Sequence, residues 1–198
     1  MSPRIGLDGT AVLMAAVDVA NEEGAEAVSM TSVAKRLGIR PPSLYNHVSG
    51  LEQIRTELAI YALKRLHGHI ADAVGELTGE PAVRRFAEAY LSFAGESPGL
   101  YDAVQIAPGL DDGALQEASG RIVDLTLHYL GSYPLTEAEA LHAVRGLRSL
   151  IHGFASLSRQ GGFALPLEVR DSLRFNLDLF LAGLEQLARS RQGGRTNN

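Results

Sequence analysis

Two short helical patterns joined by a glycine occupy a stretch of this chain that has no acidic residue. The stretch runs from Ala27 to Leu51, whereas the whole chain has 23 Asp and Glu among its 198 residues and a formal net charge of −5. Lys35, Arg36 and Arg40 lie inside it. We therefore expect a compact helix-turn-helix segment with a local excess of positive charge.

The ends of both short helices follow from the chemistry of single residues. Ser29 can accept a hydrogen bond from a free backbone N–H at the start of a helix that begins near Met30. Gly38 suits the left-handed residue with which many helices end. Pro41 and Pro42 suit the first turn of the next helix, where a missing N–H costs nothing. The sequence thus predicts a helix, a tight turn and a second helix.

The second helix is expected to expose a polar surface. Leu44 and Val48 lie one turn apart on its buried side. The other side chains then point outward, and groove-facing side chains of this kind can contact the edges of bases. They are Ser43, Tyr45, Asn46 and His47. This arrangement is typical of a helix-turn-helix that binds DNA.

Each of these features has an ordinary structural alternative. Lys35, Arg36 and Arg40 are also consistent with a solvated helix face, and Tyr45 with a surface side chain that anchors packing. The rival interpretation of the whole chain is an all-α protein that binds a small molecule or catalyses a reaction and has no role on DNA. A mobility shift on DNA from its own promoter region would separate the two classes.

The composition restricts the remaining classes. The chain has no cysteine, which removes disulfides, Cys-ligated zinc and a thiol nucleophile. It has no apolar run of about 18 residues that could span a bilayer, and no apolar signal core after Met1. We therefore expect a cytoplasmic protein without membrane contact.

The rest of the chain also has helical spacing. Apolar residues repeat at helical intervals over about 10–23, 51–75, 81–95, 98–105, 112–131, 136–160 and 167–189, with Gly or Pro between these segments. Ser49 with Glu52, and Thr136 with Glu139, have the spacing of a capping box. Residues 190–198 have no apolar anchor and are expected to be disordered. The fold class is therefore all-α.

Several of these segments resemble a known family. Ala27-Val28-Ser29-Met30, Val33-Ala34 with Leu37-Gly38-Ile39, and Leu44-Tyr45-Asn46-His47-Val48 look like the DNA-binding domain of the tetracycline-repressor (TetR) family. Gly146-Leu147-Arg148-Ser149-Leu150-Ile151-His152-Gly153-Phe154 and Gly161-Gly162-Phe163 are similar to the C-terminal domain of a branch with a His-Gly-Phe (WHG-type) motif. The resemblance implies a homodimeric regulator, usually a repressor, that leaves a palindromic operator when a small-molecule inducer binds.

The resemblance also implies how the chain is divided. An N-terminal three-helix helix-turn-helix domain is expected at residues 1–50, a helical ligand-binding and dimerisation domain at 51–189, and a disordered tail at 190–198. The helices near 136–160 and 167–189 are expected to pair with their symmetry mates, because their apolar residues occupy more than one face. Among these residues are Leu141, Val144, Leu147, Leu173, Leu177, Phe180, Leu181 and Leu184.

The family's DNA contacts can be carried over position by position. They fall on Thr31, Ser32, Arg40, Pro41, Pro42, Ser43, Tyr45, Asn46 and His47. Tyr45 is expected to donate its hydroxyl to a phosphate. Many relatives have a Lys at the position of Leu51 and a basic residue near Thr31, and both charges are missing here. We therefore expect weaker or more salt-sensitive binding, which Arg4 in a minor groove would partly compensate.

An inducer site is expected in the middle helices. Their aromatic and polar residues could line an apolar pocket, although the same helical spacing is also typical of a packed core. The candidates are Phe86, Tyr90, Phe93, Tyr101, Gln105, His128 and Tyr129.

No catalytic or metal site is expected. His67 and His69 are two positions apart on a helix and point to different sides, and the other histidines lack a spaced carboxylate or Cys partner. His152 is expected to be packed and hydrogen-bonded at a close helix contact that Gly153 allows. Asp111-Asp112 looks like a helix start. The chain is thus expected to be neither an enzyme nor dependent on a cofactor.

Overall fold

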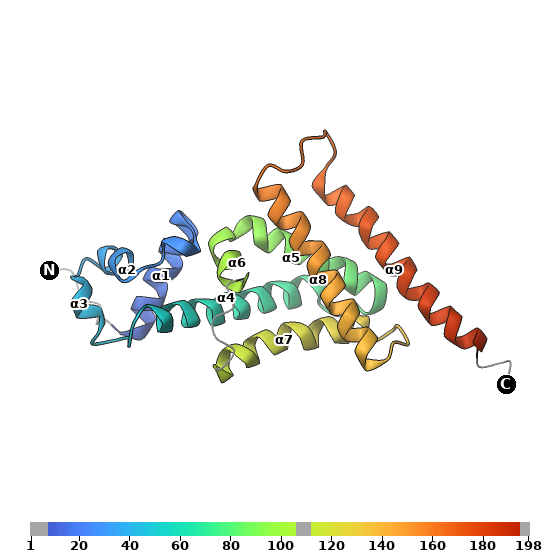
Figure 1. Ribbon diagram of the computed structural model, residues 1–198, viewed down its shortest axis with the longest axis horizontal. Coiled ribbons are helices and arrows are strands. Elements are labelled where there is room, and N and C mark those ends of the chain that lie inside the picture. Colours follow the sequence, from blue (N-terminus) through green and yellow to red (C-terminus); the bar gives the residue numbers. More distant parts are fainter. Residues whose placement is uncertain (1–7, 106–111, 195–198) are drawn as a thin grey trace. The chain divides into compact units, whose positions relative to one another are not determined.

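The computed structural model describes residues 8–105 and 112–194, with side chains up to Ser190. All regular structure in these residues is helical, as predicted (Figure 1). The elements are α1 (Gly9–Glu23), the 3₁₀ helix η1 (Ala25–Ala27), α2 (Met30–Leu37), α3 (Pro41–Leu44), α4 (Leu51–Val74), α5 (Gly79–Glu96), α6 (Pro98–Gln105), α7 (Gly113–Leu130), α8 (Glu137–Arg159) and α9 (Val169–Gly194). None of these helices combines the length and the hydropathy needed to cross a bilayer.

The described residues form two compact units. The first contains the chain up to Leu66 together with Glu96–Ser119, and the second contains His67–Gly95 together with the chain from Gly120 onward. The division differs from the predicted boundary at residue 50, because α6 and the first part of α4 belong with the helix-turn-helix. α4 and α7 are continuous helices that contribute to both units.

In the first unit, α1 provides the surface on which the other helices pack. Asp8 caps it by accepting a hydrogen bond from the N–H of Ala11 at 2.8 Å. Its buried side includes Val12 and Ala16, as the helical spacing predicts. The N-terminal turn of α6 lies against the end of α1, where a Cβ on Gly99 would lie 1.9 Å from the carbonyl oxygen of Ala20. Only a glycine therefore permits this approach.

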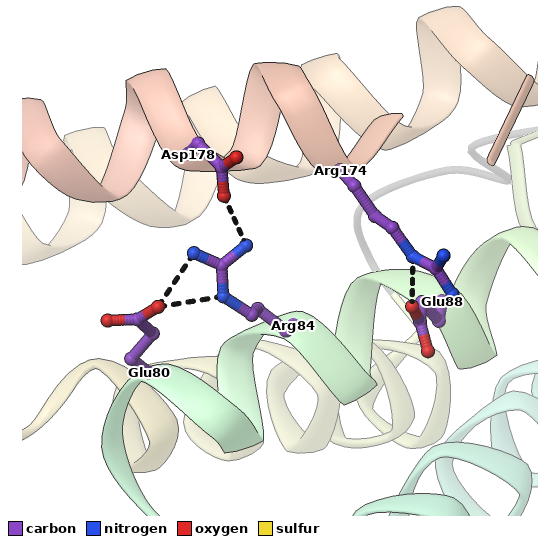
Figure 2. Close-up of polar contacts among 5 residues, drawn as sticks. All are labelled: Glu80, Arg84, Glu88, Arg174 and Asp178. Carbon is purple, nitrogen blue, oxygen red and sulfur yellow. Dashed lines mark hydrogen bonds and ion pairs between the residues drawn. The ribbon is translucent and has the colours of Figure 1, made fainter. Parts of the chain in front are cut away.

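In the second unit, ion pairs fix α9 beside α5 (Figure 2). Arg84 of α5 donates to Glu80 at 2.8 Å and to Asp178 of α9 at 2.5 Å. Arg174 of α9 donates to Glu88 of α5 at 3.0 Å. Surface pairs of this kind contribute about 0–1 kcal/mol each, so their main effect is on the rotation and register of α9.

The ion pairs separate two apolar faces of α9. One face is buried within the chain and consists of Leu173, Leu177, Leu181 and Leu184. The other face is solvent-exposed and carries Phe175 and Leu179, which are 62% and 59% exposed. α9 is therefore apolar on more than one face, as predicted. The four leucines listed for this helix, however, all belong to the core of the single chain, and the exposed face consists of residues that the sequence analysis did not name.

Two of the predicted helix starts can be checked against their hydrogen bonds. Thr136 and Glu139 form the predicted capping box, in which the N–H of Thr136 donates to the carboxylate at 2.9 Å. The predicted box of Ser49 with Glu52 is wrong, because the N–H of Ser49 donates to Oε1 of Gln53 at 2.6 Å. α4 begins at Leu51, so Gln53 is its third residue and reaches the backbone that Glu52 was expected to reach. At the other end of the chain, α9 continues to Gly194, into the segment expected to be a tail.

Candidate nucleic-acid interface

The helix-turn-helix is built by local hydrogen bonds. Ser29 Oγ accepts from the N–H of Ser32 at 3.1 Å and caps α2, as predicted. Gly38 ends α2 in the left-handed conformation with φ +68°, and the N–H of Ile39 closes the turn on the carbonyl of Ala34 at 3.0 Å. Pro41 and Pro42 then occupy the first turn of α3. The turn therefore has the geometry that the sequence indicates.

The expected reading surface follows α3 and the helical turn after it. Leu44 and Val48 are buried, and the N–H of Val48 donates to the carbonyl of Leu44 at 3.0 Å, which extends the helical path beyond α3. Tyr45 is 62% exposed and Asn46 is exposed as well. Arg40, Thr31 and Pro42 are also exposed, whereas Pro41, Ser43 and His47 are half-buried.

Ser32 has a structural role that the sequence did not indicate. Its hydroxyl donates to the carbonyl of Ala27 at 2.8 Å and accepts from the N–H of Ser29 at 2.9 Å. Its own N–H is also bonded to Ser29. All of these groups serve the start of α2, so the expected DNA contact from Ser32 has no free side-chain group to make it. Arg4 lies outside the described residues.

The cations of the acid-free stretch are not equivalent. Arg36 of α2 forms a two-point ion pair with Glu22 of α1, in which Nη1 donates to Oε1 at 2.9 Å and Nη2 donates to Oε2. This hydrogen bonding holds the pKa of the Glu22 carboxyl below its ordinary value. Lys35 and Arg40 are exposed and form no ion pair within residues 8–105 and 112–194. They are the cations left to attract phosphate.

The start of α4 is tied to the end of the reading segment. Gln53 accepts from both the N–H and the hydroxyl of Ser49, at 2.6 and 2.9 Å, and donates to Glu57 at 2.7 Å. Leu51 is half-buried beside this cap. The N-terminal turn of α4 thus presents backbone N–H groups to an anion, but no cation at the position of Leu51.

The inducer candidates fall into both units. Phe86, Tyr90 and Tyr129 are buried in the second unit, where Phe86 contacts both tyrosine rings with centroids 5.9 and 6.1 Å apart. Burial raises the pKa of Tyr129. Phe93 is also buried in this unit, 5.8 Å from the ring of His69.

The remaining inducer candidates are more scattered. Tyr101 is buried and Gln105 half-buried in the first unit, while His128 is exposed at the surface of α7. The structure brings Phe86, Tyr90 and Tyr129 together as one aromatic cluster, and the ring of His128 adjoins that of Tyr129 with centroids 5.7 Å apart. This degree of burial is also what the alternative of core packing requires.

The predictions about His, Asp and Gly residues have different outcomes. Asp112 starts α7 by accepting from the N–H of Leu115 at 3.0 Å, as predicted. Within the described ranges, no three His, Asp or Glu side chains are grouped to hold a metal ion. A Cβ on Gly153 would meet nothing within 4 Å, so no helix in the described part of the chain makes the close contact expected there.

Phe175 and Leu179 form an exposed apolar stripe that the sequence analysis did not name. Phe175 and Leu179 are four positions apart, so their spacing alone indicates an apolar stripe. Spacing could not show which of the two stripes of α9 the chain itself covers.

The fold and this site define a class of protein. An all-helical chain whose capped helix, left-handed glycine turn and exposed second helix lie near its N-terminus is a helix-turn-helix protein. Residues 12–57 match bacterial regulatory proteins of the tetR family, and residues 83–180 match a tetracyclin repressor-like C-terminal domain. The chain belongs to the TetR family of transcriptional regulators.

Individual relatives agree with this assignment. The uncharacterized HTH-type transcriptional regulator YobS of Bacillus subtilis (strain 168) is 41% identical over 93% of this chain and 96% of its own length. A solved structure of a protein of unknown function from Rhodococcus sp. RHA1 has a TM-score of 0.76 at 21% identity, covering 92% of this chain and 98% of that one. A TetR variant from Acinetobacter baumannii AYE, solved with minocycline, has a TM-score of 0.68 at 21% identity with the same coverage.

Proposed function

We propose that this protein is a cytoplasmic transcriptional repressor that binds a palindromic DNA operator as a homodimer and releases it when a small molecule binds. The observation that carries the proposal is the capped helix-turn-helix, whose second helix exposes Tyr45 and Asn46 beside the unpaired cation of Arg40. Tyr45 and Arg40 would contact phosphates, and Asn46 and Ser43 would contact base edges. No enzymatic reaction is part of the proposal.

Dimerisation is supported by the exposed face of α9. Phe175 and Leu179 are large apolar side chains that the single chain leaves in water, since each is more than half exposed. The α8–α9 link adds Leu165 and Leu167, which are also exposed. Apolar surface of this extent is typical of protein interfaces. A two-fold symmetric pair would cover it with the same face of a second copy.

The small-molecule effector is supported less directly. The second unit contains the aromatic cluster of Phe86, Tyr90 and Tyr129, which is largely apolar. The Acinetobacter baumannii neighbour was solved with minocycline. We infer that an effector of this chain would be a largely apolar molecule with a few hydrogen-bonding groups.

The decisive experiment is an unbiased selection of bound DNA with the full chain, followed by a thermal-shift screen of small molecules. We expect one inverted-repeat sequence to be enriched and at least one compound both to raise the melting temperature and to release that DNA. Asn46→Ala should lose the enrichment, whereas Lys64→Ala, which removes an exposed cation from α4, should keep it. Enrichment of no sequence by a folded wild type would refute the proposed function.

A further inference from the structure

Arg55 connects α4 to the point where the helix-turn-helix begins. Its Nη2 donates a hydrogen bond to the carbonyl oxygen of Val28 at 3.3 Å. Val28 directly follows η1, and the next residue, Ser29, is the N-cap of α2. A side chain of α4 therefore holds the backbone at the entry to α2, 27 positions earlier in the chain.

The two carbonyls before the N-cap are held in different ways. The carbonyl of Ala27 accepts from Ser32 Oγ at 2.8 Å, and this bond is local to α2. The carbonyl of Val28 accepts from Arg55 instead, so it is the bond that relates α2 to α4. At the far end of the reading segment, Gln53 holds Ser49. Two side chains from the first turns of α4 are thus hydrogen-bonded to the helix-turn-helix, one at the residue before the N-cap of α2 and one at Ser49 after α3.

The surroundings of Arg55 do not suit a side chain that contacts phosphate. The residue is half-buried, and its Nε is buried without a hydrogen-bond partner in the described part of the chain. A buried donor without a partner disfavours folding. An unbranched apolar side chain of similar length would avoid that penalty, so packing alone does not explain an arginine here.

We propose that Arg55 is a positioning residue for operator recognition: it fixes the direction in which α2 leaves η1, and through α2 the placement of Tyr45 and Asn46. Base contacts need donors and acceptors in a narrow geometry. Attraction to phosphates is less directional and is governed by the number of cations. Loss of the Arg55 bond should therefore reduce discrimination between sequences and leave general attraction to DNA intact.

The test compares Arg55→Met with Arg65→Met, which removes the same charge from an exposed position of α4. Affinities for the selected operator and for a random duplex are measured over a range of salt concentrations, together with melting temperatures. Arg55→Met should bind the operator roughly tenfold more weakly, because geometries that misplace Tyr45 and Asn46 then compete with the binding-competent one. Its affinity for the random duplex, its salt slope and its melting temperature should match the wild type. Arg65→Met should discriminate like the wild type.

The conservative variant Arg55→Lys keeps one donor without the planar fork, and its discrimination should lie between those of the wild type and Arg55→Met. If Arg55→Met does not fold, Arg55→Lys carries the test, and unchanged discrimination in it overturns the role. A parallel loss on both DNAs, with a salt slope lower by about 0.9, would make Arg55 a phosphate ligand instead. Because the role presupposes the proposed function, a wild type that selects no DNA overturns both, whereas normal discrimination in a folded Arg55→Met overturns this role alone.

Discussion

At the scale of single residues, pairing decides which charges can act on DNA. Arg36 lies in the acid-free stretch, yet Glu22 from outside that stretch neutralises it. Lys35 and Arg40 keep their charge available. A second stretch, residues 140–167, also lacks acidic residues. The absence of acidic residues therefore does not by itself identify a DNA-binding surface, and the helix-turn-helix pattern has to support it.

The Glu22 pair gives a pH prediction. The pKa of Glu22 is lowered by its hydrogen bond from Arg36, so the pair stabilises the fold above the ordinary carboxyl pKa and this contribution is lost as the pH falls through the lowered value. In Arg36→Gln, the Glu22 pKa measured by NMR titration should rise towards its ordinary value. An unchanged titration would show that the pair does not persist in solution.

Tyr45 and Arg40 should contribute to DNA binding and not to stability. Both side chains are exposed, so Tyr45→Phe and Arg40→Ala should each weaken operator binding by about 1–3 kcal/mol if the contact is direct. Circular dichroism and melting temperatures should remain close to those of the wild type. Tight binding by both variants would mean that α3 is not the reading helix.

Leu51→Lys should add the cation that the family resemblance leads us to expect at the start of α4. One added phosphate contact steepens the salt dependence by roughly 0.9 in log–log slope and tightens binding to specific and non-specific DNA alike. Leu51 is half-buried, so a modest loss of stability should accompany this gain. The measurement is a salt titration of binding, and an unchanged slope in a folded variant would place Leu51 away from the phosphates.

At the scale of elements, α1 and α6 approach each other closely at Gly99. A methyl group at Gly99 would overlap the Ala20 carbonyl, so α6 or α1 would have to move. Spacing predicted both helices within a residue or two, but it contained no information on their contact. That contact joins α6 to the helix-turn-helix unit and not to the predicted C-terminal domain.

Gly99→Ala should therefore lower the free energy of unfolding by about 1–3 kcal/mol, the usual cost of overpacking. Gly68→Ala in α4 is the matched control, because its added Cβ meets nothing within 4 Å. The control should be neutral or should gain about 0.5–1 kcal/mol from better helix propensity. Denaturant unfolding measures both variants. Equal stabilities would show that α6 can shift away from α1 without cost.

At the scale of the whole molecule, the two faces of α9 have different partners. Leu173, Leu177 and Leu181 pack within the chain, whereas Phe175 and Leu179 remain in water. A substitution such as Leu177→Glu would place a charge in the core of one subunit. It would therefore report on folding and not on association.

Phe175→Glu combined with Leu179→Glu should give a folded monomer that binds the palindromic operator far more weakly than the wild type, because both half-sites no longer act together. Sedimentation measures the mass, and circular dichroism measures the fold. Leu177→Ala is the contrasting variant, which should lose about 2–5 kcal/mol of stability. A wild type that sediments as a monomer at micromolar concentration would contradict the dimer.

The sequence by itself determined the local structure of this protein. Helix starts, glycine stops and apolar spacing depend on neighbours a few residues apart, so Ser29, Gly38 and Pro42 could be interpreted without coordinates. The family pattern added the expected role of the exposed residues of α3. The same short-range reasoning assigned one cap to the wrong residue, because Ser49 is bonded to Gln53 and not to Glu52.

Only the tertiary structure decided which of these groups are already occupied. Glu22 takes the charge of Arg36, and Arg55 reaches back to Val28. Which of the two apolar faces of α9 is buried within the chain was likewise decided by the tertiary structure. The pairs that decide these assignments bring together residues 14, 27 and 94 positions apart, beyond the reach of local periodicity. Burial and pairing depend on what the fold places opposite each side chain, and one-dimensional spacing does not contain that information.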